Sequence, residues 1–395
     1  MFDYLNSYVI PIKIENIDEY YKLIQEISFS DTSKIFAGSL SHSAHINLLI
    51  KEISILLANS LRLYEMGYFD NAYYSLRSAN ELATVMLDLS DKDDSEIKNN
   101  FDDFRRGKYG KWRGKIIQEL SERGIVFKDV IEKMPNFKNN IRNLLKEINN
   151  VVHSNGRENF YCFRYHSLDK NIHYKKLELF ENHFLRSMKI VAIMRLILDP
   201  LPLLITDEEL YYRCPPIIIY PFSDEMLSVI GEKSIEEFKQ TDAYKSIESW
   251  ILSFEKQNIT VHEFLNYDFI NLDKIDDIYS QKHLIPENKL KILDLCCCTT
   301  KIVEIISGNG FYHFFTSLKR DDYNCNILDL DKLIQINNYY NIAYDEIYVS
   351  VIKIKENIKI DIKSLNNIIY IFHEEKLDDD EIRTIKRIIK DFMVI

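Results

Sequence analysis

The stretch "EINNVVHSNG", residues 147–156, ends an apolar segment at His153 and holds the clearest candidate for chemistry in the chain. A positioned histidine is the side chain most often used for proton transfer in enzymes. Asn149 lies one helical turn before His153, and Lys146 lies about two turns before it. The three side chains would supply a proton-transfer group, an orienting amide and a cation that stabilises negative charge.

His153 also has a purely structural interpretation. The Asn155-Gly156 pair that follows it is a left-handed C-cap signal, so a helix is predicted to end there. The helix dipole and the exposed carbonyl groups favour a histidine in this position. The sequence therefore leaves two interpretations of His153 open, a catalytic group and a helix end.

Helices must position this segment. From Ser41, apolar residues recur at helical spacing in two long segments, of which Gly67 closes the first and Asp70 or Asn71 starts the second. Because the connection is only a few residues long, the segments are predicted to form an antiparallel hairpin.

Two further helices follow a polar, glycine-containing stretch that is predicted to be a loop or a short helix. The first carries one apolar face, made of Ile141, Leu144, Leu145, Ile148 and Val152. The second runs through residues 175–198 and ends before Pro200 and Pro202. Residues 41–199 are thus predicted to form a bundle of four or five helices.

The helix "GYFDNAYYSLRSANELATVML", a Trp-containing polar insertion and a helix ending in "LKEINNVVHSNG" together resemble the HEPN-like helical domains of bacterial toxins and anti-phage defence proteins. The resemblance covers roughly residues 40–200. It implies a homodimer and a ribonuclease that needs no metal or other cofactor. In such a reaction a ribose 2′-hydroxyl attacks the adjacent phosphate, which requires a proton-transfer group and a cation.

The chain departs from the family signature, an Arg followed after four to six residues by a His. Arg142 is the nearest upstream arginine, and 153 − 142 = 11 positions correspond to about 16 Å along a helix, too far for one phosphate. Lys146 stands at the permitted separation but offers a point charge instead of a planar fork. In a dimer, Arg142 of one chain could instead approach His153 of the other.

Arg77 and Glu81 offer another source of the cation. Their i, i+4 spacing in "LRSANEL" allows an ion pair on the second helix of the hairpin, and the HEPN-like resemblance places an Arg and a Glu here. A structural ion pair is one interpretation. The other is that Arg77, placed beside His153, supplies the missing positive charge.

A basic segment with aromatic residues, "FRRGKYGKWRGK", is a candidate RNA-binding loop. Its cations are Arg105, Arg106, Lys108, Lys111, Arg113 and Lys115, and its aromatic residues include Trp112. Cations that neutralise phosphates beside aromatics that stack on bases are typical of single-stranded RNA binding. The alternative is a solvated loop whose Trp112 folds back onto the bundle.

The rest of the chain is predicted to be a helical connector, residues 200–285, and a small α/β domain, residues 286–395, with residues 1–40 as an N-terminal segment. Predicted strands cover residues 289–298, 346–355, 359–364 and 366–372, and a helix covers residues 378–395. The segment 291–306 resembles the first motif of Rossmann-like methyltransferases. Because Cys298 and Thr300 replace its glycines, a buried strand with packed thiols is predicted there instead.

Composition narrows the class of protein. The 50 basic and 61 acidic residues give a formal net charge of −11, which argues against general affinity for nucleic acid or anionic membranes. The sequence lacks a signal peptide pattern, a long apolar run and metal-ligand spacings, so a cytoplasmic protein without metal or cofactor is expected.

The sequence thus predicts a mainly α protein with a HEPN-like bundle and a small C-terminal α/β domain. One hypothesis is an RNA-cleaving toxin or defence effector. The other is a catalytically inactive HEPN-like module for dimerisation or sensing, which recognises a protein or nucleic-acid partner through its C-terminal domain.

Overall fold

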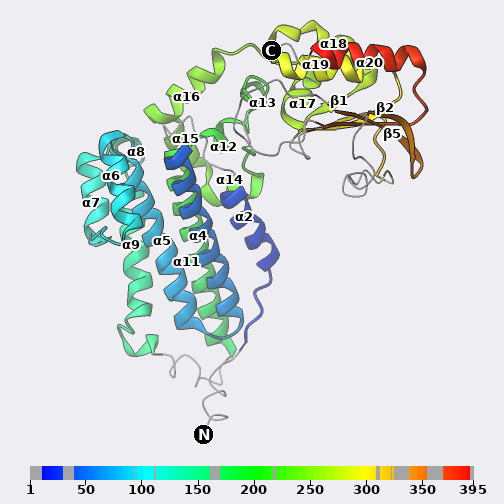
Figure 1. Ribbon diagram of the computed structural model, residues 1–395. Helices are drawn as coiled ribbons and strands as arrows, with labels where there is room; N and C mark the ends of the chain where they lie inside the picture. The colour runs from blue at the N-terminus through cyan, green and yellow to red at the C-terminus, as the bar shows by residue number, and fades with distance from the viewer. Residues whose placement is uncertain are drawn as a thin grey trace. The chain divides into compact units, whose positions relative to one another are not determined.

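The computed structural model describes residues 11–29, 40–92, 94–110, 113–160, 170–216, 219–307, 312–321, 323, 338–353 and 368–391. Its contacts divide the chain into a helical unit, Met1–Phe254, and a C-terminal unit, Glu255–Ile395 (Figure 1). The chain is mainly helical, and its six-stranded sheet belongs to the C-terminal unit. None of the helices among the described residues is long and apolar enough to cross a membrane.

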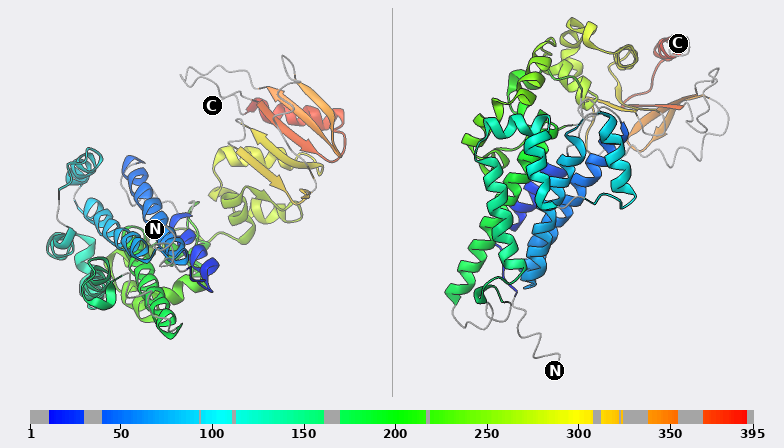
Figure 2. Two further views of the ribbon diagram at one scale, coloured as in Figure 1. Left: turned by 90° about the horizontal axis from the view of Figure 1, so that it is seen from below. Right: turned by 90° about the vertical axis from the view of Figure 1, so that its left-hand side faces the viewer.

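The helical unit is built on long helices that lie side by side (Figures 1 and 2). Its main helices are α2 (Ile17–Phe29), α4 (Leu40–Glu65), α5 (Phe69–Ser90), α6 (Asp94–Arg105), α7 (Arg113–Arg123), α8 (Val126–Lys133), α9 (Phe137–Val152) and α11 (Lys170–Leu198). The predicted hairpin of α4 and α5 is confirmed. Gly67 has φ +84° in the turn between them, a conformation that suits glycine because it has no Cβ.

Aromatic side chains pack the centre of this unit. The rings of Tyr64 and Phe180 stack with centroids 3.8 Å apart, and Phe180 meets Tyr73 edge to face at 5.5 Å. Phe180 is completely buried. These contacts join α11 to the hairpin, so the core fixes α5, on which Arg77 lies.

The polar stretch after α5 is more helical than the sequence analysis expected. Ile97, Phe101 and Phe104 recur at helical spacing on α6 and pack on the core, which favours a helix despite the charged residues around them. The glycines interrupt the chain later, at Gly107, where φ is +68°.

Residues up to Phe254 in the predicted connector pack with the helical unit. They form α12 (Leu201–Leu204), α13 (Glu208–Tyr211), α14 (Asp224–Ile230), α15 (Glu232–Lys239) and α16 (Asp242–Leu252). Leu204, Met226 and Ile251 are completely buried in the same hydrophobic core as the bundle. The division at residues 254/255 therefore falls inside the predicted connector, because the apolar faces of its first half are covered by the bundle.

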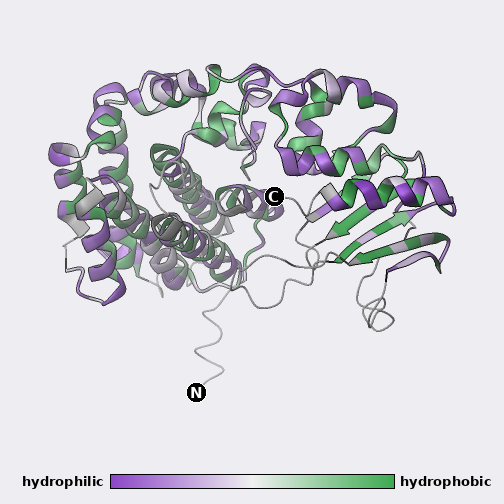
Figure 3. Ribbon diagram, turned by 45° about the horizontal axis from the view of Figure 1, so that its top comes forward, coloured by the Kyte–Doolittle hydropathy of each residue, from purple (hydrophilic) through white to green (hydrophobic). Residues whose placement is uncertain are grey.

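The C-terminal unit has a sheet with strand order β1-β3-β2-β6-β5-β4, in which β1 and β3 are parallel and the other pairs antiparallel. The strands are β1 (Phe269–Ile270), β2 (Ile302–Ser307), β3 (Tyr312–Thr316), β4 (Tyr339–Tyr344), β5 (Ile347–Lys353) and β6 (Ile368–His373). Helices α17 (Ile259–Tyr267), α18 (Ile275–Ser280), α19 (Glu287–Cys296) and α20 (Asp379–Asp391) cover one face. In Figure 3 the strands are largely hydrophobic, whereas α20 mixes hydrophobic and hydrophilic residues, as expected for a helix with one face on a sheet.

One predicted strand is wrong. Residues 289–298 do not form a strand but contain most of α19, whose Ile292, Leu293 and Cys296 are buried. The strand of this region is β2, which starts only at Ile302. Burial raises the pKa of the Cys297 thiol to about 11 and that of Cys298 to about 12.

The other predictions for this unit have three outcomes. Strands β5 and β6 and the terminal helix α20 are confirmed. The strand predicted at residues 359–364 lies outside the described residues. Strands β1, β3 and β4 had not been predicted.

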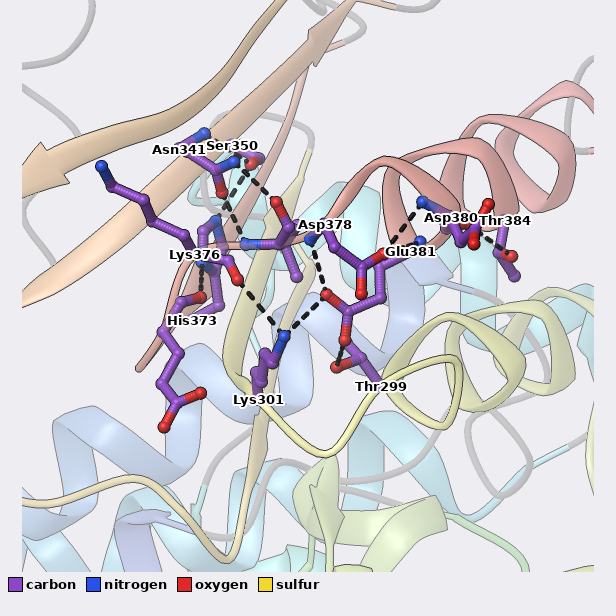
Figure 4. Close-up of polar contacts among 12 residues, drawn as sticks. Thr299, Lys301, Asn341, Ser350, His373, Lys376, Asp378, Asp380, Glu381 and Thr384 are labelled. Carbon is purple, nitrogen blue, oxygen red and sulfur yellow. Dashed lines mark hydrogen bonds and ion pairs between the residues drawn. The ribbon is translucent and has the colours of Figure 1, made fainter.

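A polar network fixes the start of α20 (Figure 4). Glu381 N donates to Asp378 Oδ1, and Asp378 N donates to Glu381 Oε2, both at 2.8 Å, which is a reciprocal helix cap. Burial works to raise the pKa of Glu381, but hydrogen bonds from Lys301 and Thr299 outweigh it and lower the pKa to about 2. The acidic residues before this helix therefore have a structural role.

Candidate active site

Arg77 and His153 meet at the surface between α5 and the end of α9. Arg77 Nη1 lies 3.2 Å from His153 Nε2, and Arg77 Nε donates to Glu81 Oε1 at 2.8 Å. A guanidinium has only donors, so Nε2 is the acceptor and carries no proton in this arrangement. Three of the predicted site residues, Arg77, Glu81 and His153, are thereby brought together.

The end of α9 explains why His153 points to this place. His153 is the residue after the last helical residue, and its N–H donates to Asn149 O at 2.9 Å. Ser154 has φ +50° and Gly156 has φ +95°, so the chain leaves the helix through left-handed residues. Tyr74 on α5 donates to Val152 O at 3.3 Å and ties this end of α9 to α5.

Charge is distributed unevenly at the site. The carbonyl end of α9 carries a partial negative charge, which by itself disfavours an anion. The guanidinium of Arg77 lies against the imidazole, and its positive charge offsets the partial negative charge of the helix end. Glu81 holds the guanidinium from the other side, and both side chains are largely shielded from solvent, with 27% and 13% exposed. An exposed imidazole beside a fixed cation is an arrangement that can move a proton and stabilise an oxyanion.

Asn149 lies one turn before His153, and its Oδ1 is buried. Among the described residues this oxygen has no hydrogen-bond partner, which is uncommon for a buried polar atom. Lys146 and Arg142 are exposed farther along α9. Among the described residues, neither forms a hydrogen bond or ion pair with Arg77 or His153, so the cation next to His153 is Arg77.

The basic segment 105–115 does not lie beside the Arg77–His153 pair. Arg105 forms an exposed ion pair with Asp102, and Arg106, Lys108 and Lys115 are exposed. Lys111, Trp112 and the side chain of Arg113 lie outside the described residues. Tyr109 donates to Asp88 Oδ2 at 2.6 Å, and Asp88 lies about 16 Å along α5 from Arg77. Tyr109 therefore holds its loop to the bundle.

A second polar network, on the side of α9 that faces α11, had not been singled out from the sequence. Tyr73 donates to His183 Nδ1 at 3.1 Å, and His183 Nε2 donates to Glu147 Oε2 at 3.1 Å. Arg186 holds the same carboxylate with two hydrogen bonds. The available signal was a histidine on the buried face of α11, which also buries Ser187 and Arg195, and such a histidine more often marks a core contact than a catalytic group.

This network predicts an acid-sensitive helical unit. Burial lowers the pKa of His183, against the opposing effect of Glu147. A histidine whose pKa is lower in the folded state stabilises the fold above its unfolded pKa of about 6.5, and this contribution is lost as the pH falls below that value. We expect the free energy of unfolding to fall between pH 7 and pH 5, and to fall less in His183→Gln.

Tryptophan fluorescence during urea unfolding measures this effect, because both tryptophans, at positions 112 and 250, lie in the helical unit. His283→Gln, which changes an exposed histidine of the C-terminal unit, serves as the control. Equal acid sensitivity of wild type and His183→Gln would show that His183 is not the cause of the acid sensitivity.

Two polar clusters of the C-terminal unit are structural. Ser350 Oγ donates to His373 Nε2 at 3.0 Å, and His373 Nδ1 donates to Glu375 O, but Ser350 and His373 are completely buried (Figure 4). Glu304, also buried, bonds to His313 and Lys319. No group of three or more His, Cys, Asp or Glu side chains in the described part of the chain could hold a metal ion.

Comparisons of the chain with protein-family models, with curated proteins and with solved structures find no match. The site is therefore interpreted from its own geometry.

Proposed function

We propose that the helical unit is a HEPN-like, metal-independent endoribonuclease domain of a bacterial toxin or anti-phage defence system, and that it acts as a homodimer. The observation that carries this proposal is the 3.2 Å contact between Arg77 Nη1 and His153 Nε2. The family signature takes its Arg and His from one segment. Here the arginine comes from α5 and the histidine from α9, so the departure in spacing does not remove the cation.

The proposed reaction uses the unprotonated Nε2 of His153 as the base, after the Arg77 guanidinium has turned from Nε2 to the bound phosphate. Nε2 takes the proton of a ribose 2′-hydroxyl, the 2′ oxygen attacks the adjacent phosphorus, and the bond to the 5′ oxygen breaks. The products are a 2′,3′-cyclic phosphate and a 5′-hydroxyl, whose proton comes from a general acid. In a homodimer the second copy would supply that acid.

Arg77 and its neighbours would act on charge and position. The guanidinium stabilises the negative charge that develops on the phosphate oxygens, and Glu81 keeps it in place at 2.8 Å. Asn149 would orient the ribose, because its Oδ1, unpaired among the described residues, can accept a hydrogen bond from a hydroxyl but not from a phosphate.

A second candidate function is a HEPN-like module without catalysis, used for dimerisation or for sensing a partner. The observation in its favour is that Nε2 of His153 is already occupied by Arg77, which in turn is paired with Glu81. Such a chain of contacts can simply hold α5 and α9 together.

The His153→Ala variant separates the two. We expect wild type to cleave single-stranded RNA in the presence of EDTA, to leave cyclic phosphate ends and to arrest growth on expression. His153→Ala should lose at least about 100-fold of this activity, whereas His283→Ala, an exposed histidine elsewhere, should retain it. Identical behaviour of wild type and His153→Ala in RNA cleavage and growth would exclude the nuclease.

A further inference from the structure

The outer face of α9 carries a row of cations that leads to His153. Arg142 and Lys146 are exposed, and Lys138 is half-buried. They are spaced four residues apart, so each is turned by about 40° from the last, and together with His153 they occupy a sector of about 80° on the helix. Figure 1 shows α9 alongside α5.

These cations are not balanced by a carboxylate of their own helix. Glu147 is the one acidic residue within α9, whose sequence is fully described. It lies about 100° away from Lys146 and turns toward α11, where His183 and Arg186 hold it. At the His153 end, Glu81 is paired with Arg77, and the carboxylate of Glu158 lies at Gly156, beyond the last residue of the row. In a chain of net charge −11 the row is thus a local positive surface.

The length and shape of the row suit one strand of nucleic acid. From Lys138 to His153 the helix rises about 22 Å, which corresponds to about six nucleotides at about 3.4 Å per nucleotide of a stacked strand. The cations form a single file, so they can follow one phosphate backbone but not the two backbones of a duplex.

We infer that Lys138, Arg142 and Lys146 bind the phosphates of a single-stranded RNA and lead it into the Arg77–His153 pair. This inference rests on the proposed ribonuclease function for its substrate. It assigns strand binding to α9 and not to the basic segment 105–115.

The test measures binding apart from cleavage. In the His153→Ala background, the variant Lys138→Gln/Arg142→Gln/Lys146→Gln is compared with Lys22→Gln/Arg62→Gln/Lys175→Gln, which removes three exposed cations from α2, α4 and α11. Fluorescence anisotropy with a labelled single-stranded 12-mer RNA is recorded over a series of salt concentrations. Melting curves check that both triple variants, whose substitutions lie at the surface, remain folded.

We expect the α9 variant to bind at least 10-fold more weakly at low salt than the control. Its slope of log affinity against log salt should be smaller by about 2, because each lost phosphate contact with a single strand removes about 0.7. A duplex of the same sequence should show no such difference. Equal affinity and equal slope for the two triple variants would overturn the inference, even if His153 proves catalytic. If wild type cleaves no RNA but only the α9 variant loses binding, the proposed nuclease function is contradicted. The assignment of strand binding to α9 is then still supported.

Discussion

Arg77→Ala and His153→Ala are each expected to slow RNA cleavage by about 10²–10⁴-fold, and the double variant is expected to be no slower than the slower single variant. A positioned proton-transfer group and a fixed cation each contribute rate factors of this size. The two side chains touch at 3.2 Å, and groups that act as a unit show strongly non-additive losses. Single-turnover cleavage of a labelled RNA measures all three rates.

Arg77→Lys distinguishes charge from geometry. A lysine keeps the positive charge but lacks the planar fork with which Arg77 reaches Glu81 through Nε and His153 through Nη1. We expect it to recover only part of the activity lost in Arg77→Ala. A shared site would be contradicted if the rate losses of the two single variants multiply in the double variant, or if Arg77→Ala keeps the full cleavage rate.

The elements around this site were predictable because their signals are local. The α4–α5 hairpin follows from apolar residues at helical spacing and from Gly67, and α9 follows from its apolar face and the Asn155-Gly156 stop. The pairing of Arg77 with Glu81 follows from i, i+4 spacing. In each case the signal comes from residues that are near one another along the chain.

The contact that completes the site is not local. Arg77 and His153 are 76 residues apart, and nothing in the sequence between them specifies how α5 and α9 are rotated against one another. That rotation is set by buried side chains on several helices at once. Sequence reasoning could therefore name Arg77 as a possible cation but could not choose it over Lys146 or Arg142.

The wrong strand at residues 289–298 has a different cause. A short apolar run gives the same signal for a buried strand and for a helix that is covered on most sides. The buried residues of α19 are Ile292, Leu293, Leu295 and Cys296, which lie on one side of a helix. In a run this short, such spacing does not separate a helix from a buried strand. The helix ends at Cys296, two residues before the run does, and β2 begins at Ile302, after the two threonines.

The same core that sets the rotation of α5 gives the largest expected effect on stability. Phe180 is completely buried and stacks on Tyr64 with ring centroids 3.8 Å apart. We expect Phe180→Ala to lower the free energy of unfolding by about 3–5 kcal/mol, through lost burial and the cavity left behind. Urea unfolding followed by tryptophan fluorescence reports this unit alone, since both tryptophans belong to it.

Leu179→Ala is the matched control, because Leu179 is the neighbouring residue on α11 but is 40% exposed. It should cost less than about 1 kcal/mol. The comparison also bears on the site. If α11 holds the α4–α5 hairpin through Phe180, the cavity should loosen α5 and reduce cleavage even under conditions where the variant remains folded. Equal losses of stability in the two variants would show that the aromatic stack does not anchor α11 to the hairpin.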